Sequence, residues 1–302
     1  MSYRGEHDFL LKNTDFTDYK GVKFDTYSID ELKKLWLETL ENGTHGLCFS
    51  MYEDGQQPGD QISKTQVERR IQILKPYTQW IRSFSCIEGN EYVPQLARKH
   101  GLKTLVGAWL GDDLKKNEDE IDNLIQLAQD GYVDIAAVGN EVMYRGDLSE
   151  AQLLDYIYLV KEAIPDVLVG YVDAYYEFSH RPKITEACDV ILANCYPYWE
   201  GCDLENSLNH MQQMFGQASH AAQGKRVIIS ETGWPSEGSP LKGAFPSREH
   251  AMQYFINAQI WCEKEGIELF YFSSFDESWK VGPEGDVGAY WGLWDKQEKL
   301  KF

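Results

Sequence analysis

Eight short apolar runs recur along the 302-residue chain, and each is followed by a polar turn and a stretch with apolar residues at helical spacing. The runs are nearly continuous in apolar and β-branched residues, which is typical of strands covered on both faces. They span residues 45–51, 80–86, 103–109, 133–139, 167–173, 189–195, 226–230 and 268–275. This alternation predicts an α/β fold, and eight such units predict a single (β/α)8 barrel, the TIM-barrel architecture.

The segments before and after these runs predict how the barrel is completed. Ser28 and Glu31 have the spacing of a capping box ahead of an amphipathic stretch, so we expect an extra N-terminal helix. The chain after the last run is short and rich in Gly and Trp, so the eighth helix should be short or missing. We expect an N-terminal extension with one helix over 1–44, packed on a catalytic barrel over 45–302. An open doubly wound sheet is the alternative, although no Gly-x-Gly-x-x-Gly loop follows the first run.

Composition excludes several classes of partner. Acidic residues number 48 against 29 basic ones, and the formal charge of -19 would repel nucleic acid and anionic membranes. No apolar stretch approaches the roughly 20 residues that cross a bilayer, and the start of the chain lacks the pattern of a signal peptide. The six cysteines form no metal-binding spacing, so we expect no metal and no cofactor. A disulfide between Cys195 and Cys202 stays open at this point.

Two glutamates stand directly behind apolar runs. Residues 136–142 read AAVGNEV, so a buried strand ends on Asn140 and Glu141, and the run 226–230 leads directly into Glu231. In a (β/α)8 barrel the carboxyl ends of the strands form the active-site mouth. Glycoside cleavage needs two carboxyl groups there, one protonated and one ionised. An ion pair with a neighbouring cation is the structural alternative for each glutamate.

Aromatic residues cluster at the same predicted end of the barrel. Their ring faces suit the C–H faces of a sugar, and their polar atoms suit its hydroxyls, so a polysaccharide fits better than a small anion. About half of the tryptophans are expected to cap the barrel core instead. The set comprises Trp109, Tyr196, Tyr198, Trp199, Trp234, Trp279, Trp291 and Trp294.

Four motifs resemble those of glycoside hydrolase family 17, a family of retaining barrel enzymes that act on β-1,3-glucan. They are AAVGNEV, NCYPYW, ISETGWPSEG and the late FDESWK followed by WGLW, and they occur in the order of that family. The resemblance implies that Glu141 is the general acid/base and Glu231 the nucleophile. A retaining pair would stand about 5 to 5.5 Å apart, with the pKa of Glu141 raised by a less polar setting.

The resemblance also implies the substrate-binding residues. Asn140 would contact the sugar 2-hydroxyl, Tyr196 would lie beside the nucleophile, and Arg82 would help to hold Glu231 ionised. A structural ion pair remains the alternative for Arg82 and for Lys280. The remaining candidates are Tyr52, Glu277 and Lys280 from the resemblance, and Trp109, Tyr198, Trp199 and Trp234 from their place at the mouth.

One position departs from the family pattern. Plant members often carry a further Glu where this chain has Gly288, and Glu284 and Asp286 are the nearby substitutes. We expect a monomeric, endo-acting β-1,3-glucan hydrolase, with a glucanosyltransferase that uses the same glutamates as the alternative and a non-catalytic glucan-binding barrel as a remote one. A polymeric substrate favours a periplasmic or extracellular location, and a cytoplasmic one stays open for imported oligosaccharides.

Overall fold

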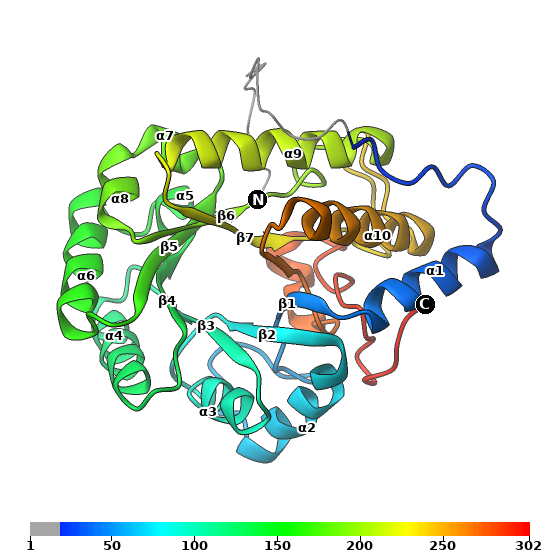
Figure 1. Ribbon diagram of the computed structural model, residues 1–302. Coiled ribbons are helices and arrows are strands. Elements are labelled where there is room, and N and C mark those ends of the chain that lie inside the picture. Colours follow the sequence, from blue (N-terminus) through cyan, green and yellow to red (C-terminus); the bar gives the residue numbers. More distant parts are fainter. Residues whose placement is uncertain (1–18) are drawn as a thin grey trace.

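The computed structural model describes residues 19–302, and the part of the expected N-terminal extension over 1–18 lies outside them. Eight parallel strands form one closed barrel in sequence order, with helices around it (Figure 1). The predicted (β/α)8 fold is therefore confirmed. The strands are β1 Thr44–Cys48, β2 Thr78–Ser83, β3 Lys103–Ala108, β4 Ile135–Asn140, β5 Leu168–Ala174, β6 Val190–Asn194, β7 Arg226–Thr232 and β8 Leu269–Tyr271.

Long helices connect the strands and cover the barrel, with shorter ones in the loops (Figure 1). The long helices are α2 Lys64–Leu74, α3 Tyr92–Lys99, α4 Leu114–Gln129, α6 Glu150–Ala163, α9 Leu204–Ala221 and α10 Arg248–Glu265. The short ones are η1 Lys75–Tyr77, α5 Val142–Arg145, α7 Glu177–His180, α8 Pro182–Ala187, η2 Ser278–Lys280 and α11 Val281–Glu284. Only η2 and α11 follow β8, so the eighth helix is indeed short.

Helix α1, Ile29–Glu41, packs beside α10 in the space that the short eighth helix leaves in the outer ring (Figure 1). Its N-terminus has the predicted capping box, because Ser28 accepts from the backbone N–H of Glu31 while the Glu31 carboxylate accepts from that of Ser28. Trp36 is fully buried, with its ring 5.8 Å from that of Phe255 on α10 and 4.9 Å from that of Phe302. Burying this ring fixes α1 on the barrel.

Strands β1 and β8 end before the apolar runs that predict them. Residues 49–51 follow β1 and residues 272–275 follow β8, and both segments remain buried. Their backbones cross the carboxyl end of the barrel: Phe49 N–H donates to Arg82 O at 2.8 Å, and Ser274 N–H donates to Cys48 O at 3.0 Å. The apolar character therefore continues because these residues close the barrel core at its carboxyl end.

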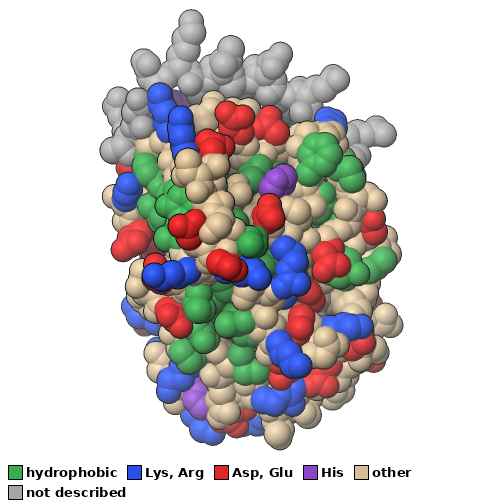
Figure 2. Space-filling model, turned by 90° about the vertical axis from the view of Figure 1, so that its right-hand side faces the viewer, with side chains coloured by type: hydrophobic (Ala, Val, Ile, Leu, Met, Phe, Trp, Pro, Cys, Tyr) green, Lys and Arg blue, Asp and Glu red, His purple; other side chains and the backbone are tan. Residues whose placement is uncertain are grey.

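All six cysteines are free thiols, so Cys195 and Cys202 do not pair. In residues 19–302 no group of three or more His, Cys, Asp or Glu side chains is placed to hold a metal ion. Within the same residues no helix is both long and apolar enough to cross a membrane. Figure 2 shows Lys and Arg side chains interspersed with Asp and Glu, so the excess of acidic residues does not form a single negative field on the face drawn there.

Candidate active site

Glu141 and Glu231 both lie at the carboxyl end of the barrel. Glu141 directly follows β4, and Glu231 is the penultimate residue of β7. The parallel pairing shifts register over residues 137–140 on β4 and over 229–232 on β7. Such irregularities bend a strand and re-aim its side chains. At both sites the usual alternation of side chains between the two faces of the strand is interrupted at the carboxyl end of the barrel.

Two donors hold the Glu231 carboxylate in place. Arg82 Nη1 donates to Glu231 Oε1 at 2.6 Å, and Tyr196 Oη donates to Oε2 at 2.8 Å. Both oxygens therefore accept hydrogen bonds, as an ionised carboxylate does. Glu231 is only 6% exposed, so these bonds also fix where its oxygens face. This is the arrangement that a nucleophilic carboxylate needs.

Arg82 connects Glu231 to the end of β4. Its Nη1 also donates to Ser230 O at 3.1 Å, while Nη2 donates to Asn140 Oδ1 at 2.7 Å. The guanidinium is 1% exposed and stacks over Phe84, at 4.3 Å from the ring centre. Burial acts to lower the pKa of Arg82, but the charge of Glu231, together with Cys48 and the hydrogen bonds to both side chains, outweighs burial and raises that pKa. Arg82 is thus a fixed cation behind Glu231 rather than a side chain open to substrate.

Asn194 at the end of β6 links Glu141 to Ser230, the residue before Glu231, and the sequence analysis missed it. Its Nδ2 donates to Glu141 Oε1 at 2.9 Å, and its Oδ1 accepts from Ser230 Oγ at 2.8 Å. Its backbone lies opposite that of Glu231 in the β6–β7 pairing. The signal was present in the sequence, because Asn194 is a polar residue at a strand end, immediately before CYPYW.

The predicted aromatic residues divide into buried and accessible ones. Tyr198 and Trp234 are at most 1% exposed, and both polar groups are used by a loop: Tyr198 Oη donates to Ser239 O and Trp234 Nε1 donates to Phe245 O. These two side chains therefore pack in the interior and hold the 239–245 loop, and their contact with a sugar stays a prediction. Trp109 is 38% exposed, with the Arg145 guanidinium 4.5 Å from its ring centre.

Several of these rings pack against one another. Tyr196 lies 5.6 Å from Trp291, and the half-buried Trp199 lies 5.4 Å from the same Trp291. Half-buried Tyr52, after β1, contacts Trp279 of η2, with ring centres 5.9 Å apart. Ring pairs at these distances are stabilising, and they fix the orientation of the rings that remain accessible.

A second charged cluster lies near the glutamates. Lys280 Nζ is 3.0 Å from Glu277 and 4.0 Å from Glu284, and it lies over the Phe272 ring. Burial lowers the pKa of Lys280, but the carboxylates of Glu277 and Glu284 outweigh it and raise that pKa. Lys280 therefore forms a structural ion pair with Glu277 and lies at the border of the site.

Glu284 lies close to Gly288, the position where plant members of the family often carry a further Glu. A side chain at Gly288 would approach Lys280 O to 2.4 Å and the Glu284 Cβ to 2.9 Å, so only glycine fits against these neighbours. Burial, together with the negative charges of Glu277, Glu231 and Glu141, raises the pKa of Glu284 to about 7. Asp286 instead accepts from Ser239 Oγ at the surface. Glu284, not Asp286, is the carboxyl group near the site.

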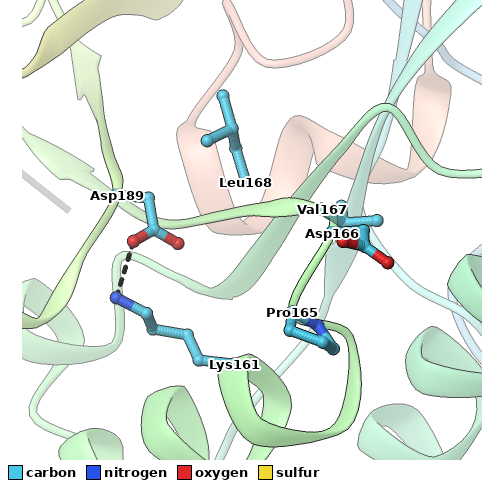
Figure 3. A pocket seen from close by; sticks show the side chains of 6 residues that line it. All are labelled: Lys161, Pro165, Asp166, Val167, Leu168 and Asp189. Atoms are coloured by element: carbon cyan, nitrogen blue, oxygen red, sulfur yellow. Dashed lines mark hydrogen bonds and ion pairs between the residues drawn. The ribbon is translucent and has the colours of Figure 1, made fainter.

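The pocket in Figure 3 lies at the opposite end of the barrel. It is lined by Lys161 of α6, the segment 165–168 that leads into β5, and Asp189 ahead of β6. Lys161 Nζ donates to Asp189 Oδ1 at 2.6 Å and to Ala187 O at 2.8 Å. These bonds satisfy the ammonium group, and residues at the amino ends of barrel strands serve stability. This pocket is therefore separate from the candidate active site.

A closed parallel barrel with two glutamates at the carboxyl ends of its strands is the arrangement of the barrel glycoside hydrolases. A family model described as the BtgE/BtgC glycoside hydrolase domain matches residues 46–292. The chain belongs to this family and is a glycoside hydrolase. The resemblance to glycoside hydrolase family 17 is confirmed.

Relatives and solved structures cover most of the chain. A glucan 1,3-beta-glucosidase of Schizosaccharomyces pombe is 30% identical over 251 residues, covering 77% of this chain and 78% of the relative. One of Saccharomyces cerevisiae is 26% identical over 265 residues, covering 80% and 85%. The crystal structure of the family 17 beta-1,3-glucanosyltransferase from Rhizomucor miehei is similar, with a TM-score of 0.77 and 28% identity over 86% of this chain and 96% of that one.

Proposed function

We propose that this protein cleaves β-1,3-glucan chains with retention at the anomeric carbon. The observation that carries the proposal is the fixed Glu231 carboxylate, held by Arg82 and Tyr196 beside an end-of-strand Glu141 that Asn194 joins to the same network. The substrate class follows from the relatives, which are named glucan 1,3-beta-glucosidases, and from the Rhizomucor miehei enzyme, whose active-site mutant binds laminaritriose.

In the first step Glu231 attacks the anomeric carbon and forms an ester bond, while the bond to the leaving sugar oxygen breaks. Glu141 gives its proton to that oxygen. In the second step Glu141 takes a proton from water, the water oxygen bonds to the anomeric carbon, and the ester bond to Glu231 breaks. Arg82 and Tyr196 receive the carboxylate again in its starting geometry.

Transfer to a second sugar is the second candidate function, and the likeness to a glucanosyltransferase favours it. An acceptor hydroxyl then replaces water in the second step. Among the predicted aromatic residues, the half-buried Trp199 and the exposed Trp109 are accessible enough to contact such an acceptor. The two outcomes differ only in which oxygen reaches the glycosyl-enzyme first.

Incubation with laminari-oligosaccharides in heavy-oxygen water, followed by mass spectrometry, tests both functions. Hydrolysis places the heavy oxygen at the anomeric position of the released fragment, and transfer gives longer products without it. The positions of cleavage distinguish the expected endo action from removal of terminal units. Absence of any product, with oligosaccharide still bound, would indicate a non-catalytic glucan-binding barrel.

A further inference from the structure

The backbone at Glu141 has an uncommon conformation. Glu141 has φ 52° and ψ 29°, in the left-handed region, and the short helix α5 begins at the next residue. A residue with a side chain adopts this conformation at a cost, and the surrounding structure must hold it there. A helix start also leaves backbone N–H groups that need acceptors. Other groups of the protein must therefore hold this turn.

Three consecutive residues of β5 accept the N–H groups of the turn. Glu141 N–H donates to Val172 O at 2.8 Å, Met143 N–H donates to Tyr171 Oη at 2.9 Å, and Tyr144 N–H donates to an Asp173 carboxyl oxygen at 3.3 Å. Strand β5 thus fixes the segment that carries Glu141 from its first residue into the helix.

Tyr171 and Asp173 are bonded to each other in this arrangement. The Tyr171 hydroxyl donates to Asp173 Oδ2, the same oxygen that receives Tyr144 N–H, and Asp173 Oδ1 accepts from Ala174 N–H at 2.8 Å. Both side chains are at most 1% exposed. Burial, and next the charge of Glu141, raise the pKa of Asp173 to about 8. A buried carboxyl group with no contact to solvent is costly, so its presence beside Glu141 calls for a reason.

We propose that Tyr171 and Asp173 are positioning residues that hold the 141–144 turn so that the Glu141 carboxyl group reaches the leaving-group oxygen. This inference rests on the proposed role of Glu141 as general acid/base. The pair acts only through the backbone of the turn and through the nearby charge of Glu141. Losing either side chain displaces the acid while leaving Glu231 and its two donors in place.

Substrates with different leaving groups separate this role from simple packing. Cleavage of a laminari-oligosaccharide needs proton donation, whereas dinitrophenol leaves a dinitrophenyl β-laminaribioside without one. For Tyr171→Phe and Asp173→Asn we expect kcat/KM on the oligosaccharide to fall about 10- to 100-fold, as for a displaced catalytic group. On the dinitrophenyl substrate kcat/KM, which reports the first step, should stay within about threefold of the unmodified protein.

Tyr254→Phe is the matched control, because it removes a hydroxyl that is also buried but is bonded to Thr232, 2.5 Å away. It should affect the two substrates equally. Equal losses on both substrates for Tyr171→Phe and Asp173→Asn would overturn the proposal and indicate a packing role, as would unchanged activity. If one variant does not fold by circular dichroism, the other decides.

Glu141→Ala distinguishes failure of this inference from failure of the proposed function. It should lose the oligosaccharide activity, retain the first step on the dinitrophenyl substrate, and recover turnover with azide. A Glu141→Ala protein that still cleaves the oligosaccharide would overturn the proposed function and this inference together. The expected Glu141→Ala behaviour with no leaving-group dependence in the two β5 variants would overturn the inference alone.

Discussion

The Arg82 guanidinium lies 2.6 Å from Glu231 Oε1, and both side chains are buried beneath the mouth of the barrel. The pair joins the exit of β2 to that of β7, almost opposite each other in the strand order. An ion pair removed from water in this way is strongly coupled, and loss of one partner leaves an uncompensated buried charge. The geometry of Arg82 should therefore control the reactivity of Glu231.

For Arg82→Lys we predict a fall in kcat/KM on laminari-oligosaccharides of about 100-fold. A lysine keeps the charge but cannot reach Glu231, Ser230 O and Asn140 together, because it lacks the planar fork. Arg226→Lys is the control, since Arg226 pairs with Glu268 at the amino end of β7 with its side chain 38% exposed, and activity should be unchanged. Equal activities for the two variants would contradict the role given to Arg82.

Tyr196→Phe removes the second donor to Glu231. A hydrogen bond to a charged group contributes about 1.5 to 3 kcal/mol, so kcat/KM should fall about 10- to 100-fold. Tyr198→Phe removes a hydroxyl that contacts only a loop carbonyl, and its effect on kcat/KM should stay within a few-fold. Steady-state kinetics on one oligosaccharide compares the two. A larger loss of kcat/KM for Tyr198→Phe than for Tyr196→Phe would contradict the role given to the Tyr196 hydroxyl.

Trp109→Ala should weaken substrate binding without affecting stability. Trp109 is 38% exposed, so part of its ring is available to a sugar and little core packing is lost, while the Arg145 guanidinium lies over one face of the ring. We predict a KM about tenfold higher on the longer oligosaccharides, with kcat nearly unchanged. Leu114→Ala, at a residue that is 50% exposed, is the control for loss of surface apolar area. A change in kcat alone would argue against binding by this ring.

His45 makes the free energy of unfolding depend on pH at the end of the barrel away from the active site. Burial lowers its pKa from 6.5 to about 4, and its ring stacks on Trp80 at 5.4 Å. The folded state therefore resists protonation, so the stabilisation is complete above pH 6.5 and is lost as the pH falls towards 4. Between pH 7 and pH 4.5 the loss should be about 2 to 3 kcal/mol.

His45→Phe is the comparison for this prediction, because a phenyl ring fills the same space and does not titrate. Its free energy of unfolding, from urea denaturation at the two pH values, should fall by about 2 to 3 kcal/mol less than that of the unmodified protein. Parallel pH profiles would show that His45 does not carry the effect. Other groups, including Asp173 and Glu284, have raised pKa values, but they are present in both proteins. Their effects on the free energy of unfolding therefore cancel when the two proteins are compared.

Much of the fold could be predicted because its determinants are local. The apolar runs and the capping box at Ser28 are short-range patterns, and both are present in the structure. The position of α1 in the outer ring could not be predicted, since it depends on the contact of Trp36 with α10. The burial of Tyr198 could not be predicted either, because it depends on contact with the loop that contains Ser239.

The two glutamates could be found from the sequence because strand ends in a barrel converge. Of the residues that support them, Asn194 could have been found as a polar residue at a strand end, whereas Tyr171 and Asp173 could not, since they act through hydrogen bonds between strands. Asp173 lies within an apolar run and has no local motif to mark it. Arg82 was named, but only the structure shows that it is buried behind Glu231.

Covalent trapping tests the central claim most directly. A 2-deoxy-2-fluoro-laminaribiosyl donor with a dinitrophenyl leaving group slows the second step and should accumulate a glycosyl ester. Peptide mass spectrometry should then find one glycosyl group on the peptide that contains Glu231, and none in Glu231→Gln. A label on Glu284 or Glu277, or no label on a protein that still turns over the unmodified substrate, would contradict the account.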